Sequence, residues 1–448
     1  MFETLLVANR GEIARRVTRT AHRLGLKVVA VHSAADTGAL HVREADDAVL
    51  LGPAPAAQSY LDQARVLEAA ARSGAQAVHP GYGFLAENAG FAQAVLDAGL
   101  VWVGPPPAAI EAMGDKVAAR ERMTAAGVPV ASGSPALADA DAAVQAARAL
   151  GYPVMVKAAA GGGGIGMAVA RDDEQVRRSF ATARTRAERA FGSGAVFVER
   201  LVEGARHVEV QVLGLADGLV VTLGERDCSV QRRHQKLAEE TPSPGVGSAL
   251  RAAMLATAVR AAQAVDYRGA GTVECLVDPA AQQFYFLEMN TRLQVEHPVT
   301  ELVTGVDLVE QQLLVAAGEP PSYDVDTVTA TGHALELRVC AEDPVRFLPS
   351  AGTITRWDEP AGEGVRVDSG VGVGDAVTPH YDSLLAKLCV WGADRDEALE
   401  RARAAVASFA VEGPRTTLPF FTELLADPGF VAGDYDTGLV GRLRAAAR

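Results

Sequence analysis

Residues 284–298, FYFLEMNTRLQVEHP, combine side chains that could hold a metal ion with side chains that could hold an anion. In an extended chain alternate residues share a face. One face would be apolar and would carry Tyr285, Leu287, Met289, Leu293 and Val295. The other face would carry Glu288, Asn290, Arg292, Gln294 and Glu296. Pro298 disfavours a helical conformation at His297, so the segment is predicted to stay extended to that point.

A solvated sheet face also alternates polar and apolar residues, and this is the simpler interpretation of the segment. The mixture of side chains argues against it. Carboxylate and amide oxygens suit Mg²⁺, whereas the guanidinium fork of Arg292 suits an anion. The segment is therefore predicted to line a site.

Glu274 lies in a predicted strand, residues 271–277, in which its neighbours are apolar. A carboxylate in such surroundings needs a cation or a metal ion beside it. The spacing to residues 284–298 permits a hairpin, which would bring Glu274, Glu288 and Asn290 together. These residues are predicted to hold Mg²⁺, with substrate phosphates completing the coordination.

A glycine-rich run, GGGGIG at residues 161–166, follows a predicted strand that ends in Lys157. The spacing matches G-x-G-x-x-G, but a strand-like segment follows instead of a helix, and no Gly-Lys-Ser/Thr closes the loop. Neither a Rossmann fingerprint nor a Walker loop is therefore indicated. A hairpin whose backbone amides fold over phosphates would explain the glycines, and a flexible surface hairpin is the alternative.

Residues 225–236, ERDCSVQRRHQK, are dense in hydrogen-bond donors. An acidic protein would need such a basic cluster to hold an anionic substrate. The donors in question are Arg226, Arg232, Arg233 and Lys236. A solvated charged segment is the usual interpretation of such a run, and two glutamates follow it closely.

The elements that must position these residues begin with an α/β pattern. Apolar strands are predicted at residues 4–8, 27–32, 48–51, 77–79 and 101–103, with helices between them, which is typical of a mostly parallel sheet. The loop HPGYGFLAEN at residues 79–88 follows a strand end, where open α/β sheets bind ligands, although its own residues favour a plain turn. Further strands are predicted at residues 152–157, 195–202, 206–212, 218–223 and 332–340.

Composition excludes several classes of protein. A chain of 448 residues suggests roughly three domains of about 150 residues each. The net charge of -14 argues against a general nucleic-acid or membrane-surface binder. No apolar run is long enough to span a membrane, and the start of the chain lacks the features of a signal peptide. The 4 cysteines are widely separated, which fits a reducing cytoplasm without a disulfide framework or zinc site.

Taken in order, these segments closely resemble the biotin carboxylase family, the ATP-grasp component of biotin-dependent carboxylases. The match covers nearly the whole chain and rests on the motifs ANRGEIA, HPGYGFLAEN, MGDK, KAAAGGGGIGM, ERDCSVQRRHQK, EMNTRLQVEHPVTE, ELRVCAEDP and HYDSLLAK. The resemblance implies an α/β fold with a Rossmann-like (pre-ATP-grasp) domain at 1–113 and a helical linker at 114–130. An ATP-grasp fold with a mobile lid at 131–203 and a C-terminal catalytic, α+β region at 204–448 would follow.

The resemblance also implies the reaction. ATP phosphorylates bicarbonate to carboxyphosphate, and CO₂ is delivered to N1 of biotin, with Mg²⁺ or Mn²⁺ as the metal. No Met-Lys-Met biotinylation site is present in these 448 residues, so biotin would arrive on another chain or on a part of the protein outside them. A carboxyltransferase would complete the complex. Acetyl-CoA carboxylase of fatty-acid synthesis is the expected system, and a homodimer the expected assembly. The alternatives are another ATP-grasp ligase, joining a carboxylate to an amine, and a nucleotide-binding regulatory protein without activity.

Residue roles follow from the resemblance alone. Nucleotide phosphates would be held by Lys116, Lys157, Gly163 and Gly164. Adenine and ribose would be surrounded by Glu199, Arg200, Leu201, Val202, His207, Gln231, His234 and Leu276, and Mg²⁺ would be held by Glu274, Glu288 and Asn290. Bicarbonate would be bound by Lys236, Arg292, Gln294 and the backbone N–H of Val295. Glu296 would deprotonate bicarbonate, Arg338 would stabilise the biotin enolate, and Tyr82 and Asp382 would line the biotin pocket.

The chain departs from the family pattern at a few positions. Ile165 and Ala168 stand in or beside the glycine hairpin where relatives usually carry basic residues. Arg23 and Glu363 replace an acidic and an aromatic residue of a dimeric relative. These substitutions bear on contacts of the lid and on the dimer.

Overall fold

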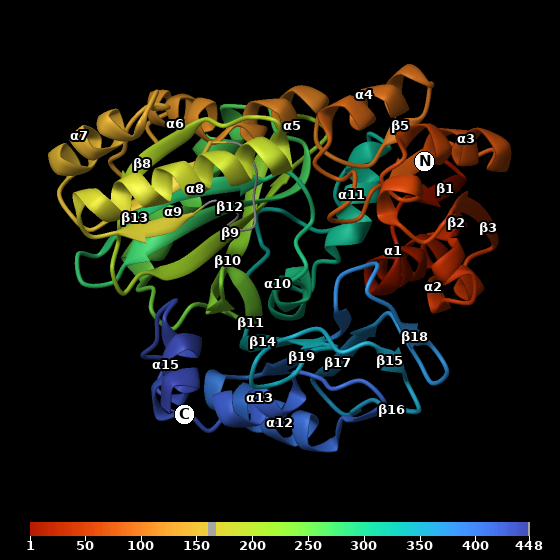
Figure 1. The fold of residues 1–448 in the computed structure, drawn as a ribbon. Coiled ribbons are helices and arrows are strands. Elements are labelled where there is room, and N and C mark those ends of the chain that lie inside the picture. The colour runs from red at the N-terminus through yellow and green to blue at the C-terminus, as the bar shows by residue number, and fades with distance from the viewer. Residues whose placement is uncertain (160–166, 447–448) are drawn as a thin grey trace.

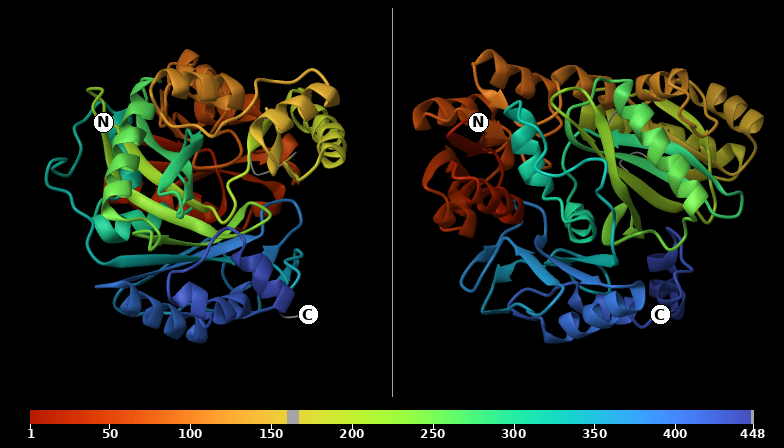
Figure 2. Two further views of the ribbon diagram at one scale, coloured as in Figure 1. Left: turned by 90° about the vertical axis from the view of Figure 1, so that its left-hand side faces the viewer. Right: turned by 180° about the vertical axis from the view of Figure 1, so that it is seen from behind.

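The computed structural model describes residues 1–159 and 167–446. The glycines expected at the phosphates, Gly163 and Gly164, and the substituted Ile165 lie outside these residues. The N-terminal region and the segment around α7 (Ala140–Leu150) and α8 (Asp173–Phe191) lie on opposite sides of the molecule, with the C-terminal helices beneath them (Figures 1 and 2).

The N-terminal region is a five-stranded sheet with the order β3-β2-β1-β4-β5. All of its pairings are parallel, as the alternation of strands and helices predicts. Leu5 and Val7 face one apolar cluster and Leu6 faces another, so the sheet is buried on both faces. The strands are β1 (Thr4–Val7), β2 (Lys27–Ser33), β3 (Asp47–Gly52), β4 (Ala77–His79) and β5 (Val101–Trp102). The helices are α1 (Gly11–Arg23), α2 (Leu40–Glu44), α3 (Gln63–Ser73), α4 (Ala89–Asp97) and α5 (Pro107–Gly114).

Helix α6 (Lys116–Ala125) leads to a small antiparallel sheet with the order β7-β6-β8. Its strands are β6 (Val154–Ala158), β7 (Ala168–Ala170) and β8 (Val196–Arg200), and α7 and α8 pack against them. Val154 pairs with Ala170 and Val156 with Ala168, so strands flank the glycine run on both sides in antiparallel pairing. The strand–glycine–strand prediction is therefore confirmed for the part of the chain that the structure describes.

The largest sheet has eight strands in the order β13-β12-β9-β10-β11-β14-β19-β17. They are β9 (Arg206–Gly214), β10 (Val220–Arg232), β11 (Gln235–Thr241), β12 (Gly269–Asp278), β13 (Gln283–Asn290), β14 (His333–Cys340), β17 (Val365–Ser369) and β19 (Leu384–Gly392). The remaining strands are β15 (Gly352–Thr353), β16 (Arg356–Asp358), β18 (Ala376–Val377) and β20 (Ala410–Glu412). The remaining helices are α9 (Ser248–Gln263), α10 (His297–Thr304), α11 (Leu308–Ala316), α12 (Arg395–Ser408), α13 (Leu418–Leu424), α14 (Pro428–Val431) and α15 (Leu439–Ala446).

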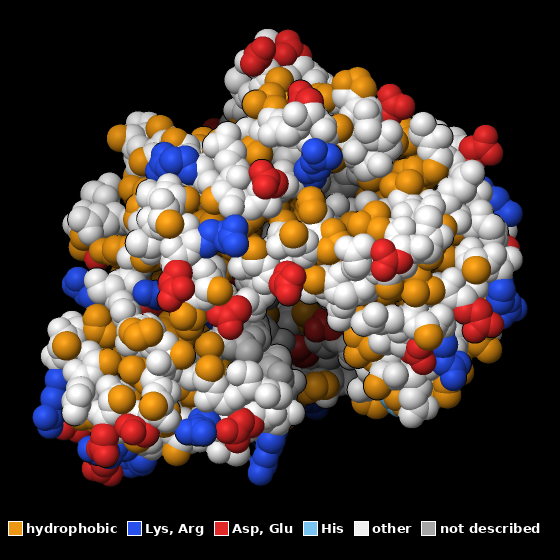
Figure 3. Space-filling model, turned by 90° about the horizontal axis from the view of Figure 1, so that it is seen from above, with side chains coloured by type: hydrophobic (Ala, Val, Ile, Leu, Met, Phe, Trp, Pro, Cys, Tyr) orange, Lys and Arg blue, Asp and Glu red, His pale blue; other side chains and the backbone are white. Residues whose placement is uncertain are grey.

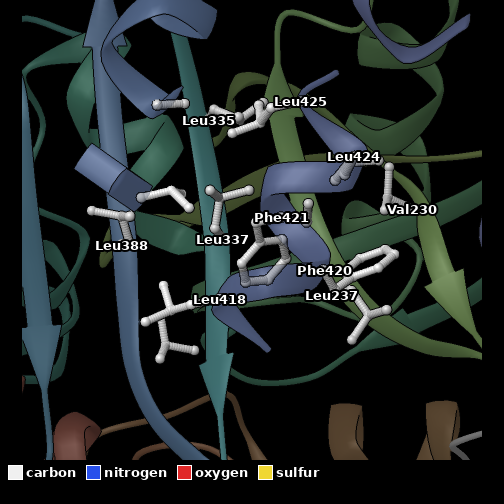
Figure 4. Packing of buried hydrophobic residues seen from close by; sticks show 14 of the residues in the cluster. Val230, Leu237, Leu335, Leu337, Leu388, Leu418, Phe420, Phe421, Leu424 and Leu425 are labelled. Carbon is white, nitrogen blue, oxygen red and sulfur yellow. The ribbon is translucent and has the colours of Figure 1, made fainter. Parts of the chain in front are cut away.

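The two faces of this sheet have opposite characters. On β14 and β19, Leu335, Leu337 and Leu388 pack against Phe420 and Phe421 of α13 (Figure 4). Alternate residues of a strand point to opposite faces, so the residues next to these leucines in the sequence face the other side of the sheet. Those residues are Glu336, Arg338 and Lys387, and they bring charge to the side on which the cleft lies.

The segment at residues 284–298 differs from its prediction in two ways. Glu288 lies opposite Glu274, but Phe286 lies opposite Cys275, so Leu287 is an extra, bulged residue. The bulge reverses the alternation, so that Phe284, Phe286 and Met289 enter the core while Tyr285 and Leu287 are half-buried. The predicted apolar face is therefore wrong before the bulge, and the predicted polar face is right at Glu288 and Asn290.

The extended conformation predicted up to His297 is also wrong. Strand β13 ends at Asn290, and His297 begins helix α10. Pro298 lies in the first turn of this helix, where its missing N–H removes no hydrogen bond. The chain therefore turns between Thr291 and Glu296, which places Glu296 at the N-terminus of the helix.

A buried ion cluster on the apolar side of the large sheet surrounds Glu240. His333 contacts its carboxylate at 2.6 Å and Arg395 donates to it at 2.7 Å. Burial opposes ionisation of Glu240, but these partners hold its pKa at about 2, below its ordinary value of 4.5. The lowered pKa means that the ionised carboxylate stabilises the fold.

We expect the melting temperature to fall as the pH drops below about 4.5 toward about 2. Stability from a lowered pKa is complete above the unfolded value and is lost as the pH approaches the folded value, here about 3 kcal/mol in total. Glu240→Gln should lower the melting temperature at pH 7 and flatten this pH dependence, as calorimetry would measure. The exposed Glu400→Gln is the control, and equal pH dependence in wild type and Glu240→Gln would contradict the assignment.

Among the described residues, no helix is both long and apolar enough to cross a membrane. The 4 cysteines are buried free thiols. Seen from above, the surface is hollowed near its centre, and hydrophobic side chains are scattered among polar ones (Figure 3).

Candidate active site

A cleft of about 760 Å³ lies between the N-terminal sheet and the large sheet. It brings together many of the residues singled out in the sequence, from segments far apart in the chain. Those lining it are Tyr82, His207, His234, Lys236, Glu274, Glu288, Asn290, Arg292, Gln294, Val295, Arg338 and Asp382. Acidic, basic and amide side chains converge here, which suits an anionic substrate with a metal ion.

Lys236 on β11 is the central cation of the cleft. Its ammonium lies 2.6 Å from Glu209, 2.9 Å from Glu274 and 2.5 Å from Glu296. Burial opposes its charge, but Cys228 and these carboxylates together raise the pKa of Lys236 well above its ordinary value. Lys236 is therefore a fixed positive charge that links the metal-type carboxylates to Glu296.

Glu296 is fully buried, and a different cation holds each of its oxygens. Oε1 accepts from Lys236 at 2.5 Å and Oε2 accepts from Arg338 at 2.8 Å. Burial alone would raise its pKa, but Lys236 and Arg338 hold the pKa of Glu296 well below its ordinary value. The carboxylate is ionised, so it can accept a proton from a substrate within reach.

Arg338 on β14 is oriented by two carboxylates. Its Nη2 lies 2.8 Å from Glu296 and 2.5 Å from Glu239. Burial raises the pKa of Glu239, Arg338 lowers it and Glu296 raises it, with the net value at about 7. The guanidinium is therefore held between two buried acids at the wall of the cleft.

Arg292 connects the turn after β13 to the N-terminal region. Its Nε donates to Glu87 at 2.9 Å and its Nη1 donates to Gln294 at 3.0 Å. Glu87 and Tyr82 belong to the loop at residues 79–88, which lines the cleft. The plain-turn interpretation of that loop is therefore wrong. The loop does more than redirect the chain, because its Glu87 contacts Arg292, more than 200 residues away.

The expected metal ligands meet in the hairpin of β12 and β13. Glu274 lies opposite Glu288, and Asn290 donates to Glu274 at 2.8 Å. Lys116 of α6 lies 2.9 Å from Glu288, and His207 lies 2.9 Å from Glu274. Clustered carboxylate and amide oxygens fit a hard cation such as Mg²⁺, and the nearby cations balance the carboxylates here.

Other predicted residues lie beside the described cleft rather than on it. Lys157 forms a buried ion pair with Glu199, which Arg120 also contacts. Gln231 donates to His207 at 3.3 Å. The predicted nucleotide contacts that do not line the cleft are Lys116, Lys157, Glu199, Arg200, Leu201, Val202, Gln231 and Leu276. Lys116 nevertheless reaches the cleft through Glu288.

The predicted basic cluster is divided. Arg226 is fully buried and donates to Glu209 at 2.7 Å. Arg233 lies exposed at the turn between β10 and β11, and of the four basic residues only Lys236 lines the described cleft. The solvated interpretation is right for Arg233, whereas Lys236 lines the cleft and its anion-binding role stays a prediction.

Two buried charged residues near the cleft also carry a sequence signal that predicts an ion pair. Glu209 and Lys387 interrupt apolar strands, as Glu274 does. The rule that a buried charge needs a partner applies equally to them. This rule predicts that such residues belong to buried ion pairs, but it does not identify the partner.

Comparison with known proteins gives matches over nearly the whole chain. Residues 1–110 match the family model "Biotin carboxylase, N-terminal domain", and residues 336–442 match "Biotin carboxylase C-terminal domain". Residues 115–322 match "Carbamoyl-phosphate synthase L chain, ATP binding domain".

Individual relatives are similar over nearly all of this chain. The biotin carboxylase of Halalkalibacterium halodurans is 52% identical, with 98% of this chain and 97% of that protein covered. The propionyl-CoA carboxylase alpha chain of Ruegeria pomeroyi is 49% identical, with 98% of this chain and 68% of that protein covered. The solved biotin carboxylase domain dimer of Hydrogenobacter thermophilus 2-oxoglutarate carboxylase, with MgADP, ADP and bicarbonate, is 43% identical. It superimposes with a TM-score of 0.95 over 99% of this chain and 98% of that chain.

Proposed function

Because the chain belongs to the biotin carboxylase family, we propose that its cleft carboxylates biotin, using ATP and bicarbonate. The single observation that carries this proposal is the placement of Glu296. It is an ionised, fully buried carboxylate between Lys236 and Arg338, beside the donors of the turn after β13. Bicarbonate must lose a proton to become a good nucleophile, and a positioned carboxylate is the group that removes it.

Bicarbonate is proposed to bind between Lys236 and Arg292. The guanidinium of Arg292 is held by Glu87 and Gln294, so its planar fork is oriented before the anion arrives. Gln294 and the N–H of Val295 supply further donors from the same turn. The anion would then lie within reach of Glu296, whose proton acceptance converts it to the attacking form.

The nucleotide and its metal are proposed to occupy the other end of the cleft. Glu274, Glu288 and Asn290 would hold Mg²⁺, which neutralises charge on the phosphates when bound. Lys116 and Lys157 would neutralise further phosphate charge, and each now pairs with a glutamate of this chain. Adenine and ribose would lie toward residues 199–202, with His207, Gln231, His234 and Leu276.

Biotin is proposed to enter beside Arg338, Tyr82 and Asp382. Its enolate is a developing anion, and Arg338 is a preorganised cation that faces the cleft. Arg338 and Lys236 also share Glu296, so biotin and bicarbonate would meet across one carboxylate. The acceptor would then lie next to the group that activates the carboxyl donor.

The partners are proposed from chemistry and from the family. A carrier protein or domain would bring biotin, and a carboxyltransferase would pass the carboxyl group to its acceptor. Acetyl-CoA is the proposed acceptor, although relatives include a propionyl-CoA carboxylase and a 2-oxoglutarate carboxylase. A homodimer is the proposed assembly, and the division at residues 1–113, 114–130, 131–203 and 204–448 is the proposed domain organisation.

The proposal is tested by ADP release from ATP, Mg²⁺, bicarbonate and free biotin. We expect turnover that requires bicarbonate and rises with biotin or with a biotinylated carrier. Absence of biotin-stimulated turnover with both acceptors would refute the proposal. ADP release that needs an amine and no bicarbonate would instead identify a carboxylate–amine ligase of the ATP-grasp class.

A further inference from the structure

Lys387 is a fully buried lysine on β19 that does not line the described cleft. Its ammonium donates to the carbonyl of Val295 at 3.0 Å and lies 3.0 Å from Glu12. Burial opposes its charge, but Glu12, Glu336 and Asp368 raise the pKa of Lys387. A permanent cation therefore lies directly behind the turn that carries Val295 and Glu296.

His297 holds the preceding peptide from the same turn. Its Nδ1 lies 2.8 Å from the carbonyl of Gln294. Burial lowers the pKa of His297 well below its ordinary value, as do Lys387, Arg16 and Arg366. The ring is therefore neutral, and because a carbonyl can only accept, Nδ1 carries the proton.

These two bonds fix the direction of the backbone donor. The carbonyl of Gln294 and the N–H of Val295 belong to one planar trans peptide, so they point in opposite directions. Holding this carbonyl orients the Val295 N–H, and holding the Val295 carbonyl orients the next peptide, which leads into Glu296.

Lys387 also reaches the opposite wall of the cleft through Glu12. Glu12 is buried at the start of α1, and its second oxygen accepts a hydrogen bond from the Tyr82 hydroxyl. Asn9 donates to the carbonyl of Tyr82 at 2.8 Å, so the loop is tied to the same end of α1. The turn after β13 and the start of α1 thus meet at the Lys387 ammonium, and Glu12 links them to the loop that carries Tyr82.

We propose that Lys387 and His297 are positioning residues that hold residues 294–296 for bicarbonate, and that the Lys387–Glu12 pair ties this turn to Tyr82. The inference rests on the proposed function, because it assigns bicarbonate to this turn. It predicts that loss of the ammonium weakens bicarbonate use selectively, since the nucleotide end of the cleft has no contact with Lys387 among the described residues.

The test compares Lys387→Met and Glu12→Gln with wild type. We expect Lys387→Met to raise the KM for bicarbonate at least tenfold and to lower kcat several-fold, with the KM for ATP within twofold. Glu12→Gln should shift the bicarbonate KM in the same direction by less. In hydrogen exchange followed by mass spectrometry, the peptide around residues 293–297 should exchange faster in both variants.

The control is Glu240→Gln, which disrupts a buried ion cluster on the opposite face of the same sheet. It should lower stability without changing the bicarbonate KM or the exchange of residues 293–297. An unchanged bicarbonate KM, or an equal rise in the KM for ATP, would overturn the inference. So would unchanged exchange.

The remaining outcomes are also decisive. If Lys387→Met does not fold, Glu12→Gln gives the answer by the same criteria. If wild-type protein shows no bicarbonate-dependent ADP release, the proposed function fails. Hydrogen exchange then still decides whether Lys387 positions the turn, because that measurement needs no activity.

Discussion

Glu296→Gln is expected to lower bicarbonate-dependent ADP release by roughly 10²–10⁴-fold while nucleotide binding stays near normal. Glutamine keeps the shape and the hydrogen-bonding reach of the side chain but cannot take a proton. Glu296 contacts Lys236 and Arg338. It is not one of the two carboxylates, Glu274 and Glu288, that are proposed to hold Mg²⁺. The loss should therefore appear in kcat with bicarbonate and not in the affinity for MgADP.

Steady-state kinetics and calorimetric titration with MgADP measure the two quantities separately. Glu301→Gln is a matched control, because Glu301 is also buried and accepts from Arg16 at 2.7 Å and Arg366 at 2.8 Å, away from the described cleft. That variant should lose stability and keep turnover per folded molecule. A large loss of MgADP affinity in Glu296→Gln would contradict the role given to Glu296.

The charges of the site explain why such a buried carboxylate is tolerated. Glu209, Glu274 and Glu296 surround Lys236, and Glu296 also contacts Arg338. Removing one partner leaves the others unbalanced in a desolvated place, which costs several kcal/mol in comparable pairs. The arrangement therefore sets the ionisation of Glu296 and makes each member of the cluster costly to remove.

Much of the framework could be predicted because its signals are local. Each strand of the N-terminal sheet is a short apolar run between helical segments, and all of those predicted form. Glu274 is predictable as a charge among apolar neighbours, and the spacing to Glu288 permits the hairpin that the structure forms. The donor-rich run that contains Lys236 is also a local signal, whereas the role of Arg338 follows only from the family motifs. Nothing local in either strand specifies a shared glutamate.

The remainder depends on contacts between distant residues or on small changes in strand register. The bulge at Leu287 changes which side chains face the core, and an alternating pattern cannot reveal one inserted residue. Pro298 predicts an extended conformation at His297, because a proline disfavours a helix at the residue before it. A proline fits equally well in the first turn of a helix, and this is what the structure shows. The pairs Arg292–Glu87 and Lys387–Glu12 join segments hundreds of residues apart, which only the assembled fold brings together.

Arg338→Ala is expected to reduce biotin carboxylation by roughly 10²–10³-fold, the loss typical when one donor to a developing oxyanion is removed. Bicarbonate-dependent ATP cleavage without biotin should fall much less, because Lys236 still contacts Glu296 at 2.5 Å. The two rates are measured on one preparation, as carboxybiotin formed and as ADP released. Their ratio reports the step in which Arg338 acts.

Glu239→Gln distinguishes a role for the guanidinium itself from a general disturbance of the buried charges. Glu239 lies 2.5 Å from Arg338 and has no contact with Lys236 among the described residues, so its variant keeps the cation and removes one support. We expect a smaller loss of carboxybiotin in this variant, with the same bias toward the biotin step. Equal losses of ATP cleavage and biotin carboxylation in Arg338→Ala would mean that Arg338 serves Glu296 rather than the biotin enolate. In that case the cation that stabilises the enolate would have to be sought among the other donors of the cleft, of which Lys236 is the nearest to Glu296.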